Sequence, residues 1–247
     1  MFYDGEHSPA MEFARMSGVA RWHARHPYYW FNSVLCSRDA SPADGVLIDE
    51  TLTYFKSKGI PSIGWWLEDS VSRAGWKDLL SPRGFKFSEG SPGMSVDLAK
   101  LPERVPTPPG FDMRIVKDAQ SLVPFAHLVN TVFGFSADVE PAAYEWALGR
   151  GLEMPYVNYM AYLDGTPIGT STVYYGAGVA GIYNVAVAPE ARGRGIGGAL
   201  TLQPLLDARR MGYRAGILQA TKMGFPVYQG LGFEQDCNVG CFHCDLA

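Results

Sequence analysis

Hydrophobic positions in the second half of the chain follow two periods, one typical of strands and one typical of helices. Short apolar runs bounded by turn residues predict strands at residues 111–116, 159–163, 168–175, 182–187 and 213–220. Apolar positions three and four residues apart predict helices at residues 118–132, 141–149 and 196–210, and a short helix near 226–229. Asp164-Gly165 predicts a hairpin, because this dipeptide readily supplies the positive φ of a tight turn. Antiparallel strands followed by one β-α-β crossover indicate the α+β class.

The first half of the chain repeats part of this pattern. It has a helical stretch at residues 47–59 and an apolar strand at 60–66. The pairs Gly84-Phe85 and Asp97-Leu98 recur as Gly232-Phe233 and Asp245-Leu246, each displaced by 148 residues. The matched order of elements and dipeptides indicates a divergent internal duplication.

A proline-rich segment separates the two halves. Residues 101–110 read LPERVPTPPG, with four prolines in ten residues. Proline fixes φ and lacks an amide donor, so the segment should be an extended connector rather than part of a helix or strand. We therefore predict domains at residues 1–100 and 111–247, joined by a linker at 101–110.

Composition narrows the classes of function. The 247 residues include 21 Lys and Arg against 25 Asp and Glu, which gives a net charge of −4. This balance disfavours nucleic acid as a partner, because phosphate binding needs a basic surface. No apolar run is long enough for a membrane span, the N-terminus does not resemble a signal peptide, and four cysteines do not suggest a disulfide framework. We expect a soluble cytoplasmic protein with no membrane partner; the oligomeric state stays open.

The candidate ligand-binding residues are concentrated in residues 181–200, GIYNVAVAPEARGRGIGGAL. Here a strand leads through an Arg- and Gly-rich loop into a helix. Consecutive amides at a helix N-terminus favour an anion, which predicts a phosphate or pyrophosphate ligand. Gly193, Gly195 and Gly198 also match the dinucleotide pattern G-x-G-x-x-G. That pattern requires an acidic residue at the end of the next strand, and residues 213–220 contain none. The Walker pattern fails too, because no Lys-Ser/Thr follows the glycines.

Two motifs together resemble a known superfamily. Arg192-x-x-Gly195-x-Gly197, after the strand Val185-Ala-Val187-Ala-Pro189-Glu190, is similar to the acyl-CoA pyrophosphate loop of the GNAT superfamily of N-acyltransferases. Tyr228-Gln-Gly-Leu-Gly232-Phe233 resembles the Tyr-x-x-x-Gly-Phe segment of that superfamily. The resemblance covers about residues 111–247. It implies tandem GNAT-like domains, each a mixed, mostly antiparallel sheet flanked by helices. The first domain is a degenerate copy, because it lacks Arg-x-x-Gly-x-Gly.

The resemblance also implies roles for individual residues. The pantetheine arm of acetyl-CoA, or of another acyl-CoA, would pair with the backbone of Val185, Ala186 and Val187. Its pyrophosphate would bind the loop formed by Arg192, Gly193, Arg194, Gly195, Ile196, Gly197 and Gly198. Tyr228 would protonate the leaving thiolate. Thr221 stands where many members of the superfamily have an Asn that contacts the cofactor.

The implied reaction is acyl transfer to a primary amine of a small molecule or peptide by direct attack. Some members have a Glu on the central strand as general base, whereas this chain has Tyr183 and Asn184, so the base stays open. A catalytically silent acyl-CoA sensor or scaffold is the alternative, and a nicotinamide oxidoreductase is a third candidate. Candidates for the acceptor wall lie in the loop and helix that border the acceptor site in related enzymes: Phe133, Phe135, Asp138, Glu140 and Tyr144.

The C-terminal cysteines present a separate pattern. Cys237, Cys241 and Cys244 have the C-x₃-C-x₂-C spacing that resembles the iron–sulfur loop of radical SAM enzymes. With His243 they are also a candidate zinc set. Side chains alternate along a strand, so Cys241 and His243 should point to one face and Cys244 to the other. We therefore expect no metal site.

Overall fold

A computed structural model of the chain describes residues 12–246, except 17, 25–27, 69, 70, 72, 136, 138, 139 and 150. The chain divides into two compact units. Unit 1 comprises residues 1–91 and 237–247, and unit 2 comprises residues 92–236. No helix among the described residues is long and apolar enough to cross a membrane.

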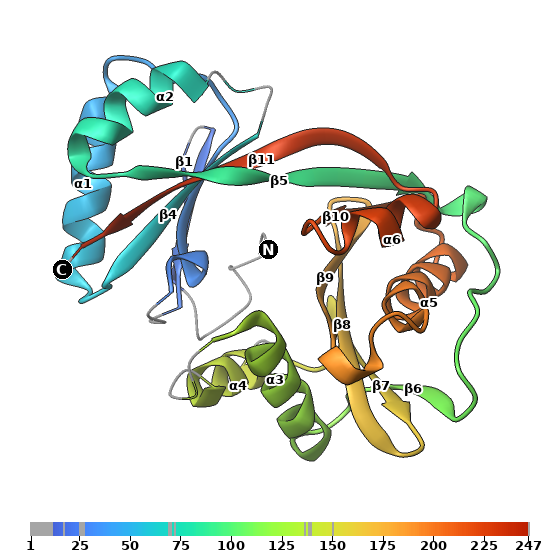
Figure 1. The fold of residues 1–247 in the computed structure, drawn as a ribbon. Coiled ribbons are helices and arrows are strands. Elements are labelled where there is room, and N and C mark those ends of the chain that lie inside the picture. The colour runs from blue at the N-terminus through green and yellow to red at the C-terminus, as the bar shows by residue number, and fades with distance from the viewer. Residues whose placement is uncertain are drawn as a thin grey trace. The chain divides into compact units, whose positions relative to one another are not determined.

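Unit 1 is a sheet covered on one face by two helices (Figure 1). Its elements are β1 (Glu12–Met16), β2 (Val19–His23), η2 (Tyr29–Phe31), β3 (Asn32–Cys36), α1 (Asp44–Ser57), β4 (Ser62–Glu68), α2 (Arg73–Leu80), η3 (Ser81–Arg83), the first part of β5 (Lys86–Asp97) and most of β11 (Glu234–Asp245). The strand order is β1-β2-β3-β4-β11-β5. Trp65 of β4 and Trp76 of α2 are fully buried, with ring centroids 5.3 Å apart, so large aromatic side chains fill this core.

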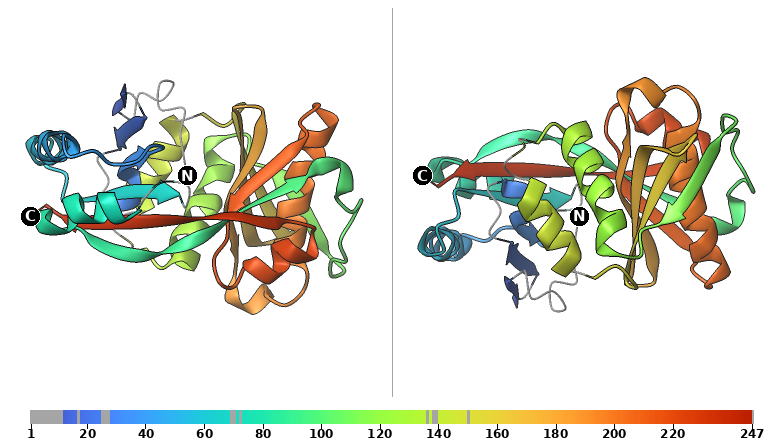
Figure 2. Two further views of the ribbon diagram at one scale, coloured as in Figure 1. Left: turned by 90° about the horizontal axis from the view of Figure 1, so that it is seen from above. Right: turned by 90° about the horizontal axis from the view of Figure 1, so that it is seen from below.

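Unit 2 is a sheet with helices on both faces. Its elements are the end of β5, η4 (Leu98–Lys100), β6 (Phe111–Ile115), α3 (Ala119–Phe133), α4 (Glu140–Gly149), β7 (Tyr156–Leu163), β8 (Thr166–Gly176), β9 (Val179–Val187), η6 (Pro189–Ala191), α5 (Ile196–Arg210), β10 (Ala215–Gln219), α6 (Phe225–Gly230) and the start of β11. The strand order is β5-β10-β9-β8-β7-β6. Helix α5 packs against one face of β8 and β9, and α3 packs against the other (Figures 1 and 2).

The predicted elements of the second half are confirmed, with bounds that shift by a few residues. The predicted helix 196–210 is α5, and the predicted hairpin is the antiparallel pair β7–β8 around Asp164-Gly165. β9 and β10 pair in parallel across α5, which is the predicted crossover. The α+β class follows from this arrangement.

The structure repeats one arrangement of elements in both halves. β3-α1-β4-α2-β5 and β9-α5-β10-α6-β11 have the same order, and β3–β4 and β9–β10 are both parallel pairs. Gly84 and Gly232 have φ of 87° and 93°. The amide of the following Phe donates to Leu80 in the first copy and to Tyr228 in the second, at 3.3 and 3.1 Å. Leu80 therefore stands where the second copy has Tyr228.

The compact units have different bounds from the predicted domains 1–100 and 111–247. β4 pairs in antiparallel fashion with β11, and β10 pairs in the same way with β5. Each central strand therefore lies beside the final strand of the other copy, so the units divide the chain within β5 and β11. Residues 101–110 have no helix or strand, as predicted, but they belong to unit 2.

In unit 1 a carboxylate of the protein itself accepts hydrogen bonds from the loop before α1. Asp44, which is 4% exposed, accepts two hydrogen bonds from the guanidinium of Arg38 at 2.6 and 2.8 Å. It also accepts the Ser41 amide at 2.7 Å. These donors hold the pKa of Asp44 well below its usual range. In the second copy the corresponding loop is rich in glycine and lies at the N-terminus of α5.

We expect Asp44→Asn to reduce the free energy of unfolding at pH 7 by about 2 kcal/mol, because Arg38 loses its charged partner. The pKa of Asp44 is lower in the folded protein than in the unfolded chain. Its stabilisation is therefore complete above about pH 5, begins to decrease as the pH falls below about 4, and is lost as the pH falls through the lowered pKa of the folded state. Urea unfolding at pH 7 and pH 3 measures both effects. Glu50→Gln, an exposed change on the same helix, is the control and should have no effect. Equal stability of Asp44→Asn and the wild type at pH 7 would contradict this account.

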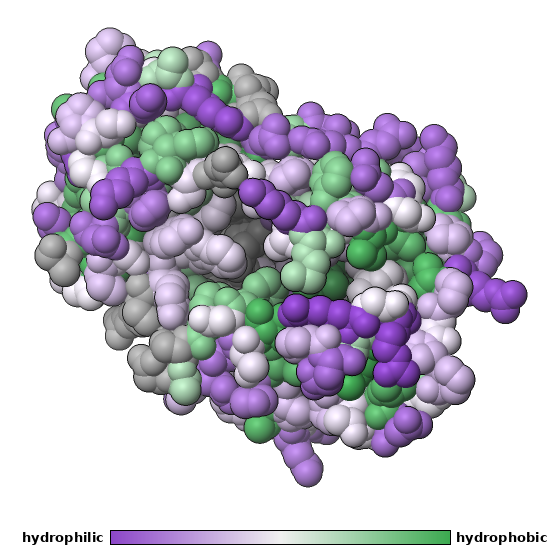
Figure 3. Space-filling view, in the orientation of Figure 1, coloured by the Kyte–Doolittle hydropathy of each residue, from purple (hydrophilic) through white to green (hydrophobic). Residues whose placement is uncertain are grey.

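The surface seen in Figure 3 is mixed in character. Hydrophilic side chains cover much of each unit, and hydrophobic side chains occur in small groups among them. This mixture is usual for a protein whose apolar side chains are largely in its cores.

Candidate functional site

β9 separates from β10 part-way along its length. The parallel pairing of the two strands ends at Ile182 opposite Leu218, although β9 continues to Val187. On its other edge β9 stays paired with β8 as far as Val187 opposite Gly169. The last residues of β9 thus have one edge that does not pair with β10. Such an edge can form strand-like hydrogen bonds with an extended ligand that carries amide groups.

A β-bulge lies where the strands separate. Thr172 is opposite Tyr183 and Thr170 is opposite Ala186, so β9 has one extra residue between these pairs. Asn184 adopts a φ of 51°, a left-handed conformation that Asn tolerates better than most residues. A buried hydrogen-bond chain supports it: Thr170 Oγ1 donates to the Asn184 carbonyl at 2.8 Å, and Asn184 Nδ2 donates to Thr172 Oγ1 at 3.1 Å. Thr172 donates in turn to Asn158 Oδ1 at 2.8 Å.

The bulge at Asn184 was not predicted from the sequence. An Asn within an otherwise apolar strand is the signal that could have indicated it, because Asn is enriched at positive φ. Neither Tyr183 nor Asn184 is a carboxylate, and β7, β8, β9 and β10 contain no Asp or Glu.

The register decides which of the three predicted β9 residues offer their backbone to a ligand. Ala188 donates its amide to the Ile168 carbonyl on β8. By the alternation of an antiparallel ladder, the backbone groups of Ala186 also point to β8, and those of Val185 and Val187 point to the opposite edge. The Val187 carbonyl already accepts Nε of Arg192 at 3.1 Å. The backbone amide and carbonyl of Val185 and the amide of Val187 are therefore the groups that can form hydrogen bonds with a ligand.

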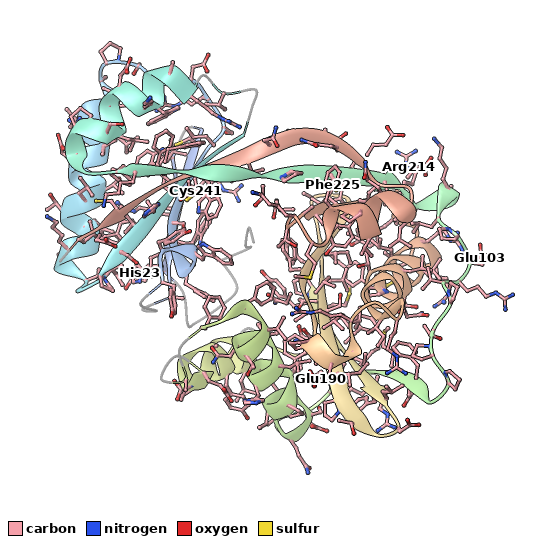
Figure 4. All side chains as sticks on the ribbon, viewed as in Figure 1. His23, Glu103, Glu190, Arg214, Phe225 and Cys241 are labelled. Atoms are coloured by element: carbon pink, nitrogen blue, oxygen red, sulfur yellow. The ribbon has the colours of Figure 1, made fainter. Side chains whose placement is uncertain are left out.

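The glycine loop lies between η6 and α5, just after Glu190 in Figure 4. Gly193 and Gly195 have φ of 73° and 78°, which only glycine adopts easily. Among the described residues, the amides of residues 193–198 donate to no carbonyl or side chain. They include the first amides of α5, where the helix dipole favours negative charge. Unpaired amides at a helix N-terminus are an arrangement that suits an anion.

Helix α6 carries Tyr228 and begins at Phe225, which Figure 4 labels. The Tyr228 ring lies over Gly224, and its centroid is 6.0 Å from that of Phe233. The side chain is 8% exposed, and burial raises the pKa of Tyr228 to about 12. No partner of its hydroxyl is present in the described part of the chain. Tyr228 is therefore a neutral phenol that keeps its proton at physiological pH.

Thr221 has a structural role at the start of α6. Its Oγ1 accepts the amide of Gly224 at 3.1 Å, and its carbonyl accepts the amide of Phe225 at 2.9 Å. These bonds satisfy helix-terminal donors in the manner of a cap. The hydroxyl proton of Thr221 stays available to a ligand.

A family model identifies this part of the chain. The acetyltransferase (GNAT) domain model matches residues 155–235, which include the open edge of β9, the glycine loop and Tyr228. Residues 155–235 are a GNAT domain. No curated protein matches the sequence significantly.

Solved structures show that the similarity in fold extends beyond residues 155–235 to both halves of the chain. A GCN5-related N-acetyltransferase from Kribbella flavida matches with a TM-score of 0.74 and 13% identity, covering 95% of this chain and 90% of that one. A GCN5-related N-acetyltransferase from Sphaerobacter thermophilus matches with a TM-score of 0.67 and 16% identity, covering 93% and 81%. A tandem GNAT protein from the clavulanic acid biosynthesis pathway has a TM-score of 0.63 and 16% identity, covering 97% and 85%. The predicted tandem GNAT-like fold is confirmed.

The predicted acceptor wall of the GNAT domain is only partly brought together. The rings of Phe133 and Phe135 are 6.2 Å apart. Glu140 contacts His127 at 3.1 Å, and the Tyr144 hydroxyl donates to the Ala119 carbonyl at 3.3 Å. Asp138 lies outside the described residues. Glu140 thus has a partner, His127, on α3.

The cysteines of β11 lie as strand alternation predicts. His243 stacks on Tyr29 at 5.4 Å, whereas Cys244 packs into the core formed with α1 and α2. All four cysteines of the chain are free thiols. Within the described ranges, no group of three or more His, Cys, Asp or Glu side chains is placed to hold a metal ion.

Proposed function

We propose that unit 2 is an N-acyltransferase that moves an acetyl group from acetyl-CoA to a primary amine. The observation that carries this proposal is the continuity of three features in the GNAT domain. The open edge of β9 leads directly into the unpaired amides of residues 193–198, and Tyr228 follows on the next helix. These features suit the amide-containing arm, the pyrophosphate and the leaving thiolate of one acyl-CoA molecule.

Each group has a defined task in this proposal. Val185 and Val187 hold the arm by backbone hydrogen bonds, and the loop amides with Arg194 hold the phosphates. The amine nitrogen attacks the thioester carbonyl carbon, and the carbon–sulfur bond breaks. The sulfur takes the proton of Tyr228, and the amine releases its extra proton to water. Tyr228 then regains a proton from solvent, so no net change of the protein remains.

Positioning supplies much of the rate in such a reaction, because attack on a thioester by a free amine needs alignment more than activation. This agrees with the absence of a carboxylate on β7 to β10. In our proposal only the second copy of the fold transfers the acyl group. In the first copy Leu80 replaces the tyrosine, and the Asp44 carboxylate accepts hydrogen bonds from the loop before α1.

The test is to incubate the protein with acetyl-CoA and a panel of amines: an amino acid, a polyamine, an amino sugar, an aminoglycoside and a peptide. We expect release of CoA that depends on one class of amine, and a product heavier by one acetyl group. Failure to bind acetyl-CoA in a calorimetric titration would refute the proposal. Tight binding without turnover on any amine would favour the sensor instead. A small-molecule or peptide acceptor and a cytoplasmic location stay predictions.

A further inference from the structure

The proline-rich segment, residues 101–110, contacts both ends of helix α5 and is called the strap below. The Glu103 carboxylate accepts two hydrogen bonds from Arg209, in the last turn of α5, at 2.8 and 2.9 Å. Arg209 also donates to the Leu98 carbonyl. From there the chain passes α5 on its way to β6, on the right of Figure 1, and Figure 4 labels Glu103 near its start. The segment is thus fixed at the end of α5 remote from the glycine loop.

At the other end of α5 the strap touches the glycine loop. The Pro106 carbonyl is so close to Gly195 that an added Cβ would overlap its oxygen. A Cβ on Gly198 would lie 3.9 Å from the methyl groups of Val105 and from a methyl group of Val227 on α6. Val105 and Val227 therefore border the same glycine from two different segments.

This place combines apolar surface with positive charge. Val227 is 39% exposed and Met223, in the turn before α6, is 64% exposed, although both are apolar. Arg104 and Arg194, which precede Val105 and Gly195 in the chain, are exposed. The combination suits a ligand that has a flat apolar ring next to phosphate groups. The nucleotide half of CoA has both a flat ring and phosphate groups. Because it is joined to the pyrophosphate, it must lie next to the glycine loop.

We propose that the strap is part of the cofactor site, with Val105 and Val227 holding the adenine ring of CoA beside the glycine loop. This inference rests on the proposed function of unit 2. It assigns a binding role to the segment that joins the two copies of the fold, and it makes the cofactor site depend on residues outside 155–235.

The experiment compares two ligands, acetyl-CoA and S-acetyl-4′-phosphopantetheine, which lacks the nucleotide. We expect Val105→Ser/Val227→Ser to weaken acetyl-CoA binding about tenfold and to leave binding of the shorter ligand unchanged. Val123→Ser is the matched control, because Val123 is 54% exposed on α3. It should change neither affinity. The single variant Val227→Ser, at the more exposed position, should show part of the same loss if the double variant folds poorly.

Two results would overturn the inference: a double variant that binds acetyl-CoA as the wild type does, or one that loses the same factor for both ligands. The second result would mean that the strap supports the loop without touching the nucleotide. A wild-type protein that binds neither ligand would instead refute the proposed function itself, so the two failures are distinguishable.

Discussion

Gly197→Asp is expected to abolish acetyl-CoA binding while the protein stays folded. A Cβ at Gly197 meets only a methyl group of Val187, at 3.8 Å, and Gly197 is not among the residues with positive φ. The new carboxylate would lie in the first turn of α5, where negative charge stabilises a helix by about 0.3–1 kcal/mol. It would also occupy the place of the pyrophosphate. Like charges at such a distance cost several kcal/mol, so we expect affinity to fall at least about 100-fold.

Calorimetric titration with acetyl-CoA, together with a thermal melt, measures both parts of this result. Gly197→Asn is the control, because it adds nearly the same volume without the charge and should retain much more of the affinity. Normal binding by Gly197→Asp would show that the loop does not hold the pyrophosphate. Gly195 is a poor position for this test, because any side chain there combines a φ of 78° with the clash against Pro106.

Tyr228→Phe is expected to lower kcat by about 10²- to 10⁴-fold, the usual contribution of a general acid. The ring and its contacts with Gly224 and Phe233 stay in place. The KM for acetyl-CoA and the melting temperature should therefore change little. Tyr213→Phe removes another tyrosine hydroxyl from unit 2 and is the control, with kcat unaffected. If Tyr228→Phe kept the wild-type kcat, the phenol would have only a packing role.

The pH dependence gives a second readout of the same residue. Burial raises the pKa of Tyr228 to about 12, so its proton is retained through the range in which acceptor amines lose theirs. We expect the rate to rise with pH as the amine is deprotonated. Ionisation of Tyr228 should cause no loss of rate until the pH approaches 12.

The local elements of the site could be predicted from the sequence because they depend on neighbouring residues. The apolar spacing of residues 196–210 defines α5, and the glycines before it define a loop with positive φ at Gly193 and Gly195. The bulge at Asn184 was not predicted, because it depends on hydroxyl groups of β8 that are far away in the sequence. The contact between Glu140 and His127 was not predicted either, because the two residues belong to different helices.

The order of elements, the duplication and the position of the glycine loop follow from the amino-acid sequence, since periodicity, glycine conformation and helix-terminal amides act over a few residues. Tertiary structure decided which strands are neighbours. It placed β11 beside β4 and β5 beside β10, so the boundary between units falls within these strands. It also placed Asp44 in the loop of unit 1, and the proline-rich segment against the glycine loop of unit 2. Strand pairing and side-chain packing join residues of large sequence separation, and no local pattern specifies such partners.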